Sequence, residues 1–311
     1  MTVGATEIGA PAAAALARRR RRFRAEGRAA FWFLLPSLLG VLAFLVFPLL
    51  ASLALSFTNW KLVGGGGFVG VANYVRLFTV DPGFWQGLGN TFLYTAEYLV
   101  LNVVIAVGMA TWISSLRWGK RLFRLIFFLP TFTPMIGVSL VWALIFVPGG
   151  LMDWLVGALG LPIPSLLLDP AWAMQAVVIV SLWSGVGYNL LLFGAALEAI
   201  PQSYLDAAKI DGATAWQRFW RIKLPLISPT LFFGVVMTAI TALQVFDQVY
   251  AMTRGGPGAA TSTLGFLIYR NGFTTYRMGY ASSIAWVMFV IIMMLTALQF
   301  RLQRKWVHYD A

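Results

Sequence analysis

One polar stretch interrupts the later half of a very apolar chain: Ser203-Tyr204-Leu205-Asp206-Ala207-Ala208-Lys209-Ile210-Asp211-Gly212-Ala213-Thr214-Ala215-Trp216-Gln217-Arg218-Phe219, followed by Leu224-Pro225. Ser203 with Asp206 three residues later predicts one capped helix, and Thr214 with Gln217 predicts a second helix that begins with a capping box. Gly212 lies between them and is the residue best able to end the first helix with a positive φ. The stretch therefore predicts a helix, a tight turn and a helix.

The composition around this stretch is that of an integral membrane protein. Hydrophobic residues make up 59% of the 311 residues and charged residues only 11%, whereas soluble globular proteins carry about 25% charged residues. The sequence has no cysteine and one histidine, His308. Disulfides, cysteine nucleophiles, histidine metal clusters and histidine-based catalytic triads are therefore excluded.

Six apolar segments are long enough to cross about 30 Å of hydrocarbon. They predict an all-α protein with six transmembrane helices, at residues 29–57, 91–116, 122–147, 172–199, 228–251 and 280–300. Proline and glycine weaken the helical hydrogen-bond ladder inside several of these spans. We expect kinks at Pro36, Pro48, Pro130, Pro134, Gly185 and Gly187.

The basic residues predict the orientation of the spans. The net charge is +12, which could indicate a nucleic-acid partner, but lysine and arginine also gather in the cytoplasmic loops of membrane proteins. With the N-terminus inside, the inner segments hold 18 basic residues and the outer loops five: Lys61, Arg76, Arg254, Arg270 and Arg277. Both termini and the 203–225 stretch are therefore expected in the cytoplasm. Residues 1–28 are predicted to be a basic, disordered cytoplasmic tail, 29–304 the transmembrane domain, and 305–311 a second cytoplasmic tail.

The motifs of several enzyme classes are missing from the sequence. The Gly119-Lys120 pair is not part of a GxxxxGK[ST] phosphate loop, so the chain lacks that device for binding ATP. A GxSxG nucleophile elbow is absent as well. Carboxylates in or near the spans are few, and Glu97, Glu198 and Asp247 are not obviously paired. Glu97 is expected to be an internal hydrogen-bond partner, and Asp247 to be an interfacial or a pathway group.

Two polar patches interrupt apolar spans: Thr131-Phe132-Thr133-Pro134, and Trp183-Ser184-Gly185-Val186-Gly187-Tyr188-Asn189. Aromatic faces beside hydroxyl and amide groups can stack on the C–H face of a sugar and hydrogen-bond to its hydroxyls. Small and hydroxylated residues also allow helices simply to pack closely. The patches therefore indicate either a solute site or close helix packing.

The opening stretch resembles the EAA loop of permease subunits in binding-protein-dependent ABC importers. The resemblance rests on Asp206-Ala207-Ala208, on Asp211-Gly212-Ala213 at the family's spacing, and on Leu224-Pro225. The sequence departs from the family at Asp206, where the family usually has glutamate. Further motifs extend the resemblance from about Phe31 to Arg304, toward the first-permease type of the carbohydrate-uptake branch: Phe57-Thr58-Asn59-Trp60, Phe68-Val69-Gly70, Asn73-Tyr74, Phe128-Leu129-Pro130, Leu243-Gln244-Val245-Phe246-Asp247 and Thr253-Arg254-Gly255-Gly256-Pro257.

This resemblance implies a function and a set of partners. The chain would be a non-catalytic permease subunit of the bacterial cell membrane, forming the path for a sugar or sugar-like solute by alternating access. It would work with a second, different permease, two ATP-binding subunits that hold ATP and Mg²⁺, and an extracytoplasmic solute-binding protein. No cofactor is expected in the chain itself. The 203–225 loop would contact the ATPase through Asp206, Ala207, Ala208, Asp211, Gly212 and Ala213.

The same resemblance implies solute-path residues on the third, fourth and fifth spans: Thr131, Met135, Ser184, Gly185, Tyr188, Thr238 and Ala242. The chemistry of their side chains adds Asn189, Thr241 and Gln244 to this set. The alternative is an ion- or proton-coupled secondary carrier, which would need intramembrane charge pairs and usually an internal repeat. An intramembrane enzyme would need a nucleophile and a base, and no such set is present.

Overall fold

The computed structural model describes residues 30–160, 165–304 and 306–307. The chain divides into two compact units, Met1–Ala54 and Leu55–Ala311, and each is considered separately. The described residues are almost entirely helical, and their only β-structure consists of isolated bridges. The predicted tail at residues 1–28 and most of the tail at 305–311 lie outside the described residues.

The first unit contributes most of one long apolar helix, Ala30–Ser56. The helix includes a π-helical turn, η1 (Leu42–Val46), followed by α2 (Phe47–Ser56). The kinks predicted at Pro36 and Pro48 do not break this helix. Proline removes one backbone donor, and next to Pro48 the wider π turn accommodates the altered hydrogen-bond ladder.

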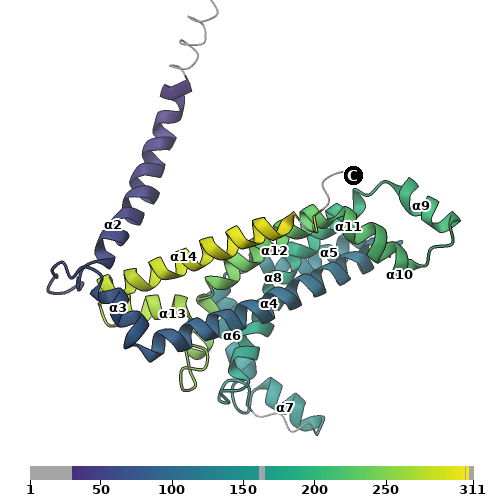
Figure 1. Ribbon diagram of the computed structural model, residues 1–311. Coiled ribbons are helices and arrows are strands. Elements are labelled where there is room, and N and C mark those ends of the chain that lie inside the picture. The colour runs from purple at the N-terminus through teal and green to yellow at the C-terminus, as the bar shows by residue number, and fades with distance from the viewer. Residues whose placement is uncertain (1–29, 161–164, 305, 308–311) are drawn as a thin grey trace, which may run out of the picture. The chain divides into compact units, whose positions relative to one another are not determined.

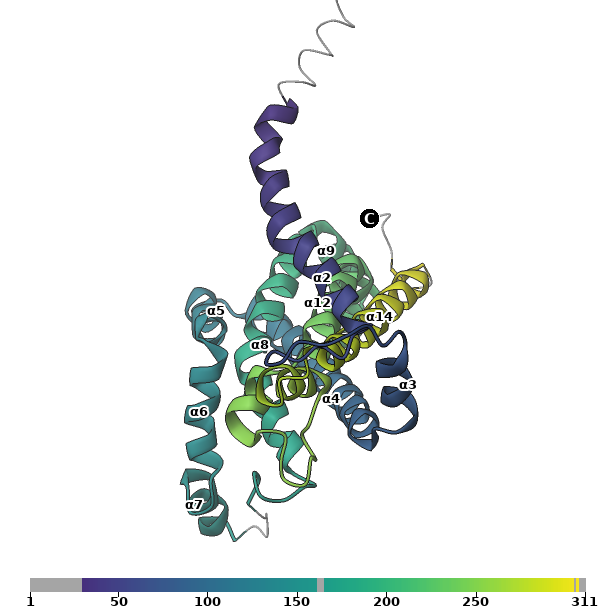
Figure 2. The same cartoon turned by 90° about the vertical axis from the view of Figure 1, so that its left-hand side faces the viewer.

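The second unit is built on four helices that run beside one another: α4 (Pro82–Ser115), α8 (Ala173–Glu198), α12 (Ser228–Leu243) and α14 (Met278–Gln303) (Figures 1 and 2). Buried apolar side chains from α4, α8 and α12 pack into one cluster around Phe193 and Leu231. A second cluster packs α3 (Ala72–Thr79) and α13 (Leu264–Tyr269) against α4 and α14, around Leu77, Phe84 and Leu264. These contacts hold the long helices together over most of their length.

The third predicted span is broken. It consists of α5 (Lys120–Phe128), a 3₁₀ turn η2 (Leu129–Phe132) and α6 (Met135–Phe146), with a bend of 99° between its two halves. Pro134 lies in the break between the halves, and Pro130 lies in the 3₁₀ turn just before it. Neither can donate the backbone hydrogen bond that would continue an α-helix. The kink predicted at these two prolines is confirmed. A short helix, α7 (Leu151–Ala158), follows α6.

The fourth span, α8, runs without a break through Gly185 and Gly187. These glycines allow close packing with neighbouring helices. A Cβ at Gly187 would lie 2.2 Å from the carbonyl oxygen of Phe127 on α5, and one at Gly185 would lie 2.0 Å from the hydroxyl of Tyr98 on α4. Both distances are far inside van der Waals contact, so only glycine permits this approach of helices.

The fifth predicted span, 228–251, is too long at its C-terminal end. α12 ends at Leu243, residues 244–246 are not helical, and η4 (Val249–Thr253) follows. Before α12, the helical run of α10 (Ala215–Arg218), η3 (Phe219–Lys223) and α11 (Leu224–Leu226) meets it at a bend of 70°. The apolar character of residues 244–251 comes from side chains that pack around a cavity rather than from a continuous helix.

The ends of two other spans also differ from prediction. α4 begins at Pro82, nine residues before the predicted start at 91, because Asp81 caps the helix by accepting a hydrogen bond from the backbone N–H of Gly83 at 2.9 Å. α14 extends slightly beyond residues 280–300 at both ends. Four helices of the described chain are long and apolar enough to cross a membrane, and the number is up to six if each bent pair is one span.

Candidate functional site

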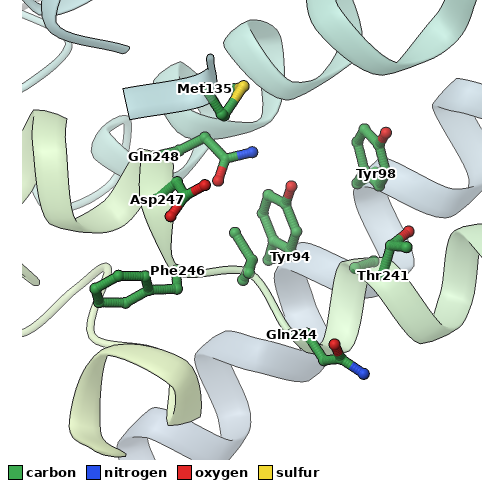
Figure 3. A pocket seen from close by; sticks show the side chains of 10 residues that line it. Tyr94, Tyr98, Met135, Thr241, Gln244, Phe246, Asp247 and Gln248 are labelled. Atoms are coloured by element: carbon green, nitrogen blue, oxygen red, sulfur yellow. The ribbon is translucent and has the colours of Figure 1, made fainter. Parts of the chain in front are cut away.

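A cavity of about 370 Å³ lies beside the non-helical segment that follows α12 (Figure 3). Tyr94 and Tyr98 of α4 line one wall, and Met135 lines another at the start of α6. The remaining wall comes from the end of α12 and the residues after it: Thr241, Ala242, Gln244, Val245, Phe246, Asp247 and Gln248. The break after Leu243 therefore presents a row of polar side chains to this cavity.

A second cavity, also of about 370 Å³, lies between α4, α8 and α12. Its lining residues are Tyr98, Gly185, Tyr188, Asn189, Met237, Thr238 and Thr241. Tyr98 and Thr241 line both cavities. The two cavities therefore adjoin at a tyrosine and a threonine, and together they offer a row of hydroxyl, amide and aromatic groups.

Aromatic and amide side chains fix the wall between the cavities. The rings of Tyr94 and Tyr98 stack with their centroids 5.6 Å apart and their planes 6° apart. The Asn102 amide donates to the hydroxyl of Tyr98 at 3.2 Å. Asn189 is 2% exposed and donates to the side-chain oxygens of Asn102 at 2.6 Å and of Thr238 at 2.8 Å. This chain of contacts joins three helices and leaves the buried Asn189 Oδ1 without a hydrogen-bond partner among the described residues.

Most of the predicted solute-path residues are brought together at these cavities. Met135, Thr241, Ala242 and Gln244 line the first, while Gly185, Tyr188, Asn189, Thr238 and again Thr241 line the second. Thr131 and Ser184 line neither cavity. The Thr131 hydroxyl instead donates to the Ser184 carbonyl at 3.0 Å, which links the broken third span to α8.

Sequence reasoning missed the contribution of the second span. Tyr94 and Tyr98 are spaced i, i+4 in an apolar helix, a spacing that puts two hydroxyl-bearing rings on one face and could have identified them. Asp247, left open between an interfacial and a pathway role, lines the first cavity. Glu97 was expected to be an internal hydrogen-bond partner, but it is half-exposed and its carboxylate forms no hydrogen bond with any described residue.

The cavity walls carry little charge. Among the described residues that line them, Asp247 is the only carboxylate and none is lysine, arginine or histidine. Within the described part of the chain, no group of three or more histidine, cysteine, aspartate or glutamate residues could hold a metal ion. The cavities are therefore suited to a solute held by stacking and neutral hydrogen bonds.

The polar stretch forms the predicted helix, turn and helix, at the end of the long helices opposite α3 (Figure 1). The first helix, α9 (Gln202–Ile210), ends in a Schellman motif. Gly212 has φ of 78° and donates its N–H to the carbonyl of Lys209 at 3.0 Å, and Ala213 donates to that of Ala208 at 2.9 Å. The prediction of a positive φ at Gly212 is confirmed.

The capping box predicted at Thr214 is confirmed, and the cap predicted at Ser203 is not. At α10 the Thr214 hydroxyl accepts from the Gln217 N–H at 3.3 Å, and the Gln217 side chain accepts from the Thr214 N–H at 2.8 Å. Ser203 does not cap α9, which begins one residue earlier after Pro201. Proline pre-sets the backbone for a helix start, and Asp206 instead accepts hydrogen bonds from Lys209 at 2.8 Å and Gln202 at 3.1 Å.

The predicted ATPase-contact residues form a surface around this turn. Asp206, Ala207, Asp211 and Gly212 are exposed, Ala213 is half-buried and Ala208 is buried. Beside them the side chain of Ile210 is 87% exposed, and the larger side chains of Tyr204 and Trp216 are also exposed. An exposed apolar surface of this kind, rimmed by charged groups, is typical of a protein-binding site.

An ion pair anchors the polar stretch to the helices. The guanidinium of Arg124 on α5 donates to the carboxylate of Glu198, the last residue of α8. α9 begins four residues after Glu198. In the turn itself, the guanidinium of Arg218 donates to the carbonyl of Ala213. Hydrogen bonds thus stabilise the α9–α10 turn, and the pair fixes the end of α8 from which it projects.

Comparisons with known proteins agree with this geometry. The chain is 34% identical over 298 residues to a probable ABC transporter permease protein, YesP, of Bacillus subtilis, covering 94% of this chain and 96% of that protein. It is 35% identical over 276 residues to the multiple sugar-binding transport system permease protein MsmF of Streptococcus mutans, covering 88% and 94%. It is 33% identical over 285 residues to the lactose transport system permease protein LacF of Rhizobium radiobacter, covering 88% and 93%.

The fold agrees as well. A crystal structure of a bacterial ABC transporter involved in the import of the acidic polysaccharide alginate contains a chain that superimposes with a TM-score of 0.81 at 22% identity, covering 92% of this chain and 99% of that one. Residues 102–308 match the model of the family described as "Binding-protein-dependent transport system inner membrane component". The chain belongs to this family, the membrane permease components of binding-protein-dependent ABC importers.

Proposed function

We propose that the two adjoining cavities are part of the path of a sugar or sugar-like solute, which crosses by alternating access. The observation that carries this proposal is the chemistry of their walls: stacked tyrosines, threonine hydroxyls and amides, with a single carboxylate. A sugar presents C–H faces that stack on aromatic rings and hydroxyls that need both donors and acceptors. The names of the relatives MsmF and LacF, a multiple sugar-binding and a lactose transport permease, favour the same class of solute.

We further propose that α9 and the turn after it are the contact with a separate ATPase subunit. The chain is a permease component and not itself an enzyme, because ATP hydrolysis in this family belongs to partner subunits. Asp206, Ala207, Ala208, Asp211, Gly212 and Ala213 would form the contact. The Schellman motif and the capping box support this role, since hydrogen bonds at both ends of the turn allow it to transmit a displacement rather than absorb it.

The assembly follows from these roles. Counting each bent helix pair as one span gives six spans, with both termini and the 203–225 loop in the cytoplasm and residues 1–28 and 305–311 as cytoplasmic tails. The partners would be a second permease, two ATP-binding subunits that carry ATP and Mg²⁺, and an extracytoplasmic solute-binding protein. A complex of the alginate transporter with a periplasmic protein supports the last of these partners.

The test is uptake into proteoliposomes that contain the assembled transporter with ATP inside. Labelled lactose and labelled sn-glycerol 3-phosphate serve as probes, because relatives carry these solutes in their names and one is neutral while the other is anionic. ATP-dependent uptake of lactose that is lost on replacing Tyr98 or Thr241 would support the proposed path. Uptake that follows a proton or sodium gradient without ATP would contradict it and favour a secondary carrier.

A further inference from the structure

Three basic side chains from distant parts of the sequence converge on one pocket, which shares no lining residue with the two cavities described above. The pocket has a volume of about 220 Å³ and is lined by Asn59, Trp60, Lys61, Asn73, Arg76, Arg277 and Tyr280. Only five basic residues are predicted on the outer side of the membrane, and three of them, Lys61, Arg76 and Arg277, line this pocket. Basic residues are scarce in outer loops, so the grouping of three of them at one pocket indicates a binding site for an anionic ligand.

Backbone and amide contacts hold the walls of the pocket in place. The Asn73 side chain donates to the carbonyls of Ser56 and Thr58, both at 2.8 Å. The loop that carries Lys61 is joined to the start of α14 by two hydrogen bonds, from Gly279 N–H to the Trp60 carbonyl and from Leu62 N–H to the Tyr276 carbonyl, each 3.0 Å long. Hydrogen bonds therefore hold in place the backbone segments that carry these basic side chains.

The positive charge in the pocket is not neutralised by the chain. Among the described residues, Lys61, Arg76 and Arg277 form no ion pair. The Arg76 guanidinium lies 5.3 Å from the centroid of the Tyr280 ring, whose hydroxyl donates to Asp81 at 2.6 Å. Asp81 also accepts from Gly83, and it is a single carboxylate beside three cations. The pocket thus has a net positive charge and suits an anion.

Apolar side chains beside the pocket indicate its depth in the membrane. α3 buries Leu77 and exposes Val75 and Phe78. Trp60 and Trp85 are also exposed, and the Trp85 indole N–H donates to the Phe78 carbonyl at 3.1 Å. Exposed tryptophan and phenylalanine next to basic side chains are typical of the headgroup level of a bilayer.

We propose that this pocket binds the phosphate of an anionic phospholipid such as phosphatidylglycerol. The guanidinium groups of Arg76 and Arg277 would bind the phosphate oxygens, as arginine does in a bidentate manner, and Lys61 would add a third positive charge. The exposed side chains of α3 would contact the acyl chains. The alternative occupant, an acidic side chain of a soluble protein, would leave the apolar face of α3 in water, so the lipid is favoured.

The experiment is a lipid titration of the full-length chain in a non-ionic detergent, followed by native mass spectrometry. The ligands are phosphatidylglycerol, phosphatidylcholine and inorganic phosphate. The pocket variant is Arg76→Gln with Arg277→Gln, and the control is Arg254→Gln with Arg270→Gln, which removes two exposed arginines predicted on the same side but outside the pocket. Each basic residue contributes about a fivefold change in affinity for an anionic lipid, so the pocket variant should bind phosphatidylglycerol on the order of 20-fold more weakly.

The outcomes separate the possibilities. The proposal holds if the control binds one phosphatidylglycerol as the wild type does, the pocket variant does not, and phosphatidylcholine binds to neither preferentially. Equal weakening in both double variants would show that only net charge matters.

Phosphate that displaces the lipid at an equal concentration would indicate a free-anion site. Unchanged lipid binding with weaker capture of the solute-binding protein would identify an acidic protein as the occupant. If the double variant fails to fold, Lys61→Gln in the exposed loop should still weaken binding about fivefold.

Discussion

The buried amide of Asn189 donates to the hydroxyl of Thr238 across 2.8 Å, and this contact joins α8 to α12 at the wall of the second cavity. The same amide donates to Asn102 on α4. Three helices are thus linked through one nitrogen. The link is polar and reversible, whereas the surrounding contacts are apolar.

The energy of this link can be measured with a double-mutant cycle of Asn189→Ala and Thr238→Ala. Interhelical hydrogen bonds in membranes contribute about 0.6 kcal/mol on average and up to about 1.7 kcal/mol, so we expect a coupling free energy in that range. The measurement is unfolding of the purified protein by a denaturing detergent. The pair Asn189→Ala and Thr79→Ala, on separate elements, should be additive within about 0.5 kcal/mol. A coupling no larger than in this control would mean that the Asn189–Thr238 contact contributes nothing to stability.

Removal of a cavity hydroxyl should slow transport without affecting assembly. Tyr98→Phe removes a group that faces both cavities and accepts a hydrogen bond from Asn102, and Tyr188→Ala removes a ring that is 45% exposed in the second cavity. The loss of one such contact corresponds to about 1–2 kcal/mol, or a five- to 30-fold lower rate of ATP-driven uptake. Binding of the ATPase subunit should be unchanged in both variants. The control is Trp118→Ala, because Trp118 lines neither cavity; this variant should bind the ATPase subunit and transport normally. Unaltered uptake by both tyrosine variants would remove these residues from the solute path.

Gly212→Pro should abolish ATP-driven uptake while the chain still inserts into the membrane. Gly212 has φ of 78° and donates its N–H to Lys209, and proline can satisfy neither requirement. The matched control is Gly160→Pro after α7, where the glycine has φ of 65° and donates to Gly157. Both variants suffer the same backbone conflict, but only the first disturbs α9. Normal uptake by Gly212→Pro would contradict a role of this turn in ATPase coupling.

Gly187→Ala should destabilise the packing of α8 against α5. Its Cβ would lie 2.2 Å from the Phe127 carbonyl oxygen, which is backbone and cannot rotate away. Overpacking of this kind costs about 1–3 kcal/mol. Gly108→Ala on α4 is the control, because a Cβ there would meet nothing within 4 Å. Thermal unfolding in detergent should therefore show a lower Tm for Gly187→Ala than for the wild type. The Tm of Gly108→Ala should be unchanged or higher, since alanine favours helix.

The ion pair of Asp206 should make coupling insensitive to pH near neutrality. Hydrogen bonds from Lys209 and Gln202 hold the pKa of the Asp206 carboxyl below its usual range, which is about 3.9. A lowered pKa means that the stabilising contribution is fully present above the usual value and is lost only as the pH falls through the lower folded value. The ratio of uptake rates between wild type and Asp206→Asn should therefore stay constant from about pH 5 to pH 8. A midpoint in this ratio within that interval would show that Asp206 titrates there.

Much of the architecture follows from local sequence signals. The breaks at Pro130 and Pro134 and the turn at Gly212 depend on the backbone limits of single residues, and the Thr214–Gln217 box depends on two residues in one turn of helix. These features appear where the sequence predicts them. The departures arise where tertiary contacts compete with local preference.

The packing partner of Gly187 could not be predicted, because the sequence cannot reveal that a carbonyl of another helix approaches it. The same holds for the two adjoining cavities. Tyr94 and Tyr98 meet Met135 and residues 244–248 only through the packing of α4, α6 and α12. Thr131 has the chemistry of a solute contact, yet its hydroxyl donates to the backbone carbonyl of Ser184 instead.

The early end of α12 has a consequence for the backbone that follows it. Residues 244–246 are not helical, so their polar groups need partners outside a helical ladder. Gln244 donates its N–H to the Thr241 carbonyl and Val245 donates to that of Ala242, while the Val245 carbonyl accepts from the Thr263 hydroxyl. The chain can therefore leave the helix here with these groups paired, which frees the side chains of Gln244, Asp247 and Gln248 to line the first cavity.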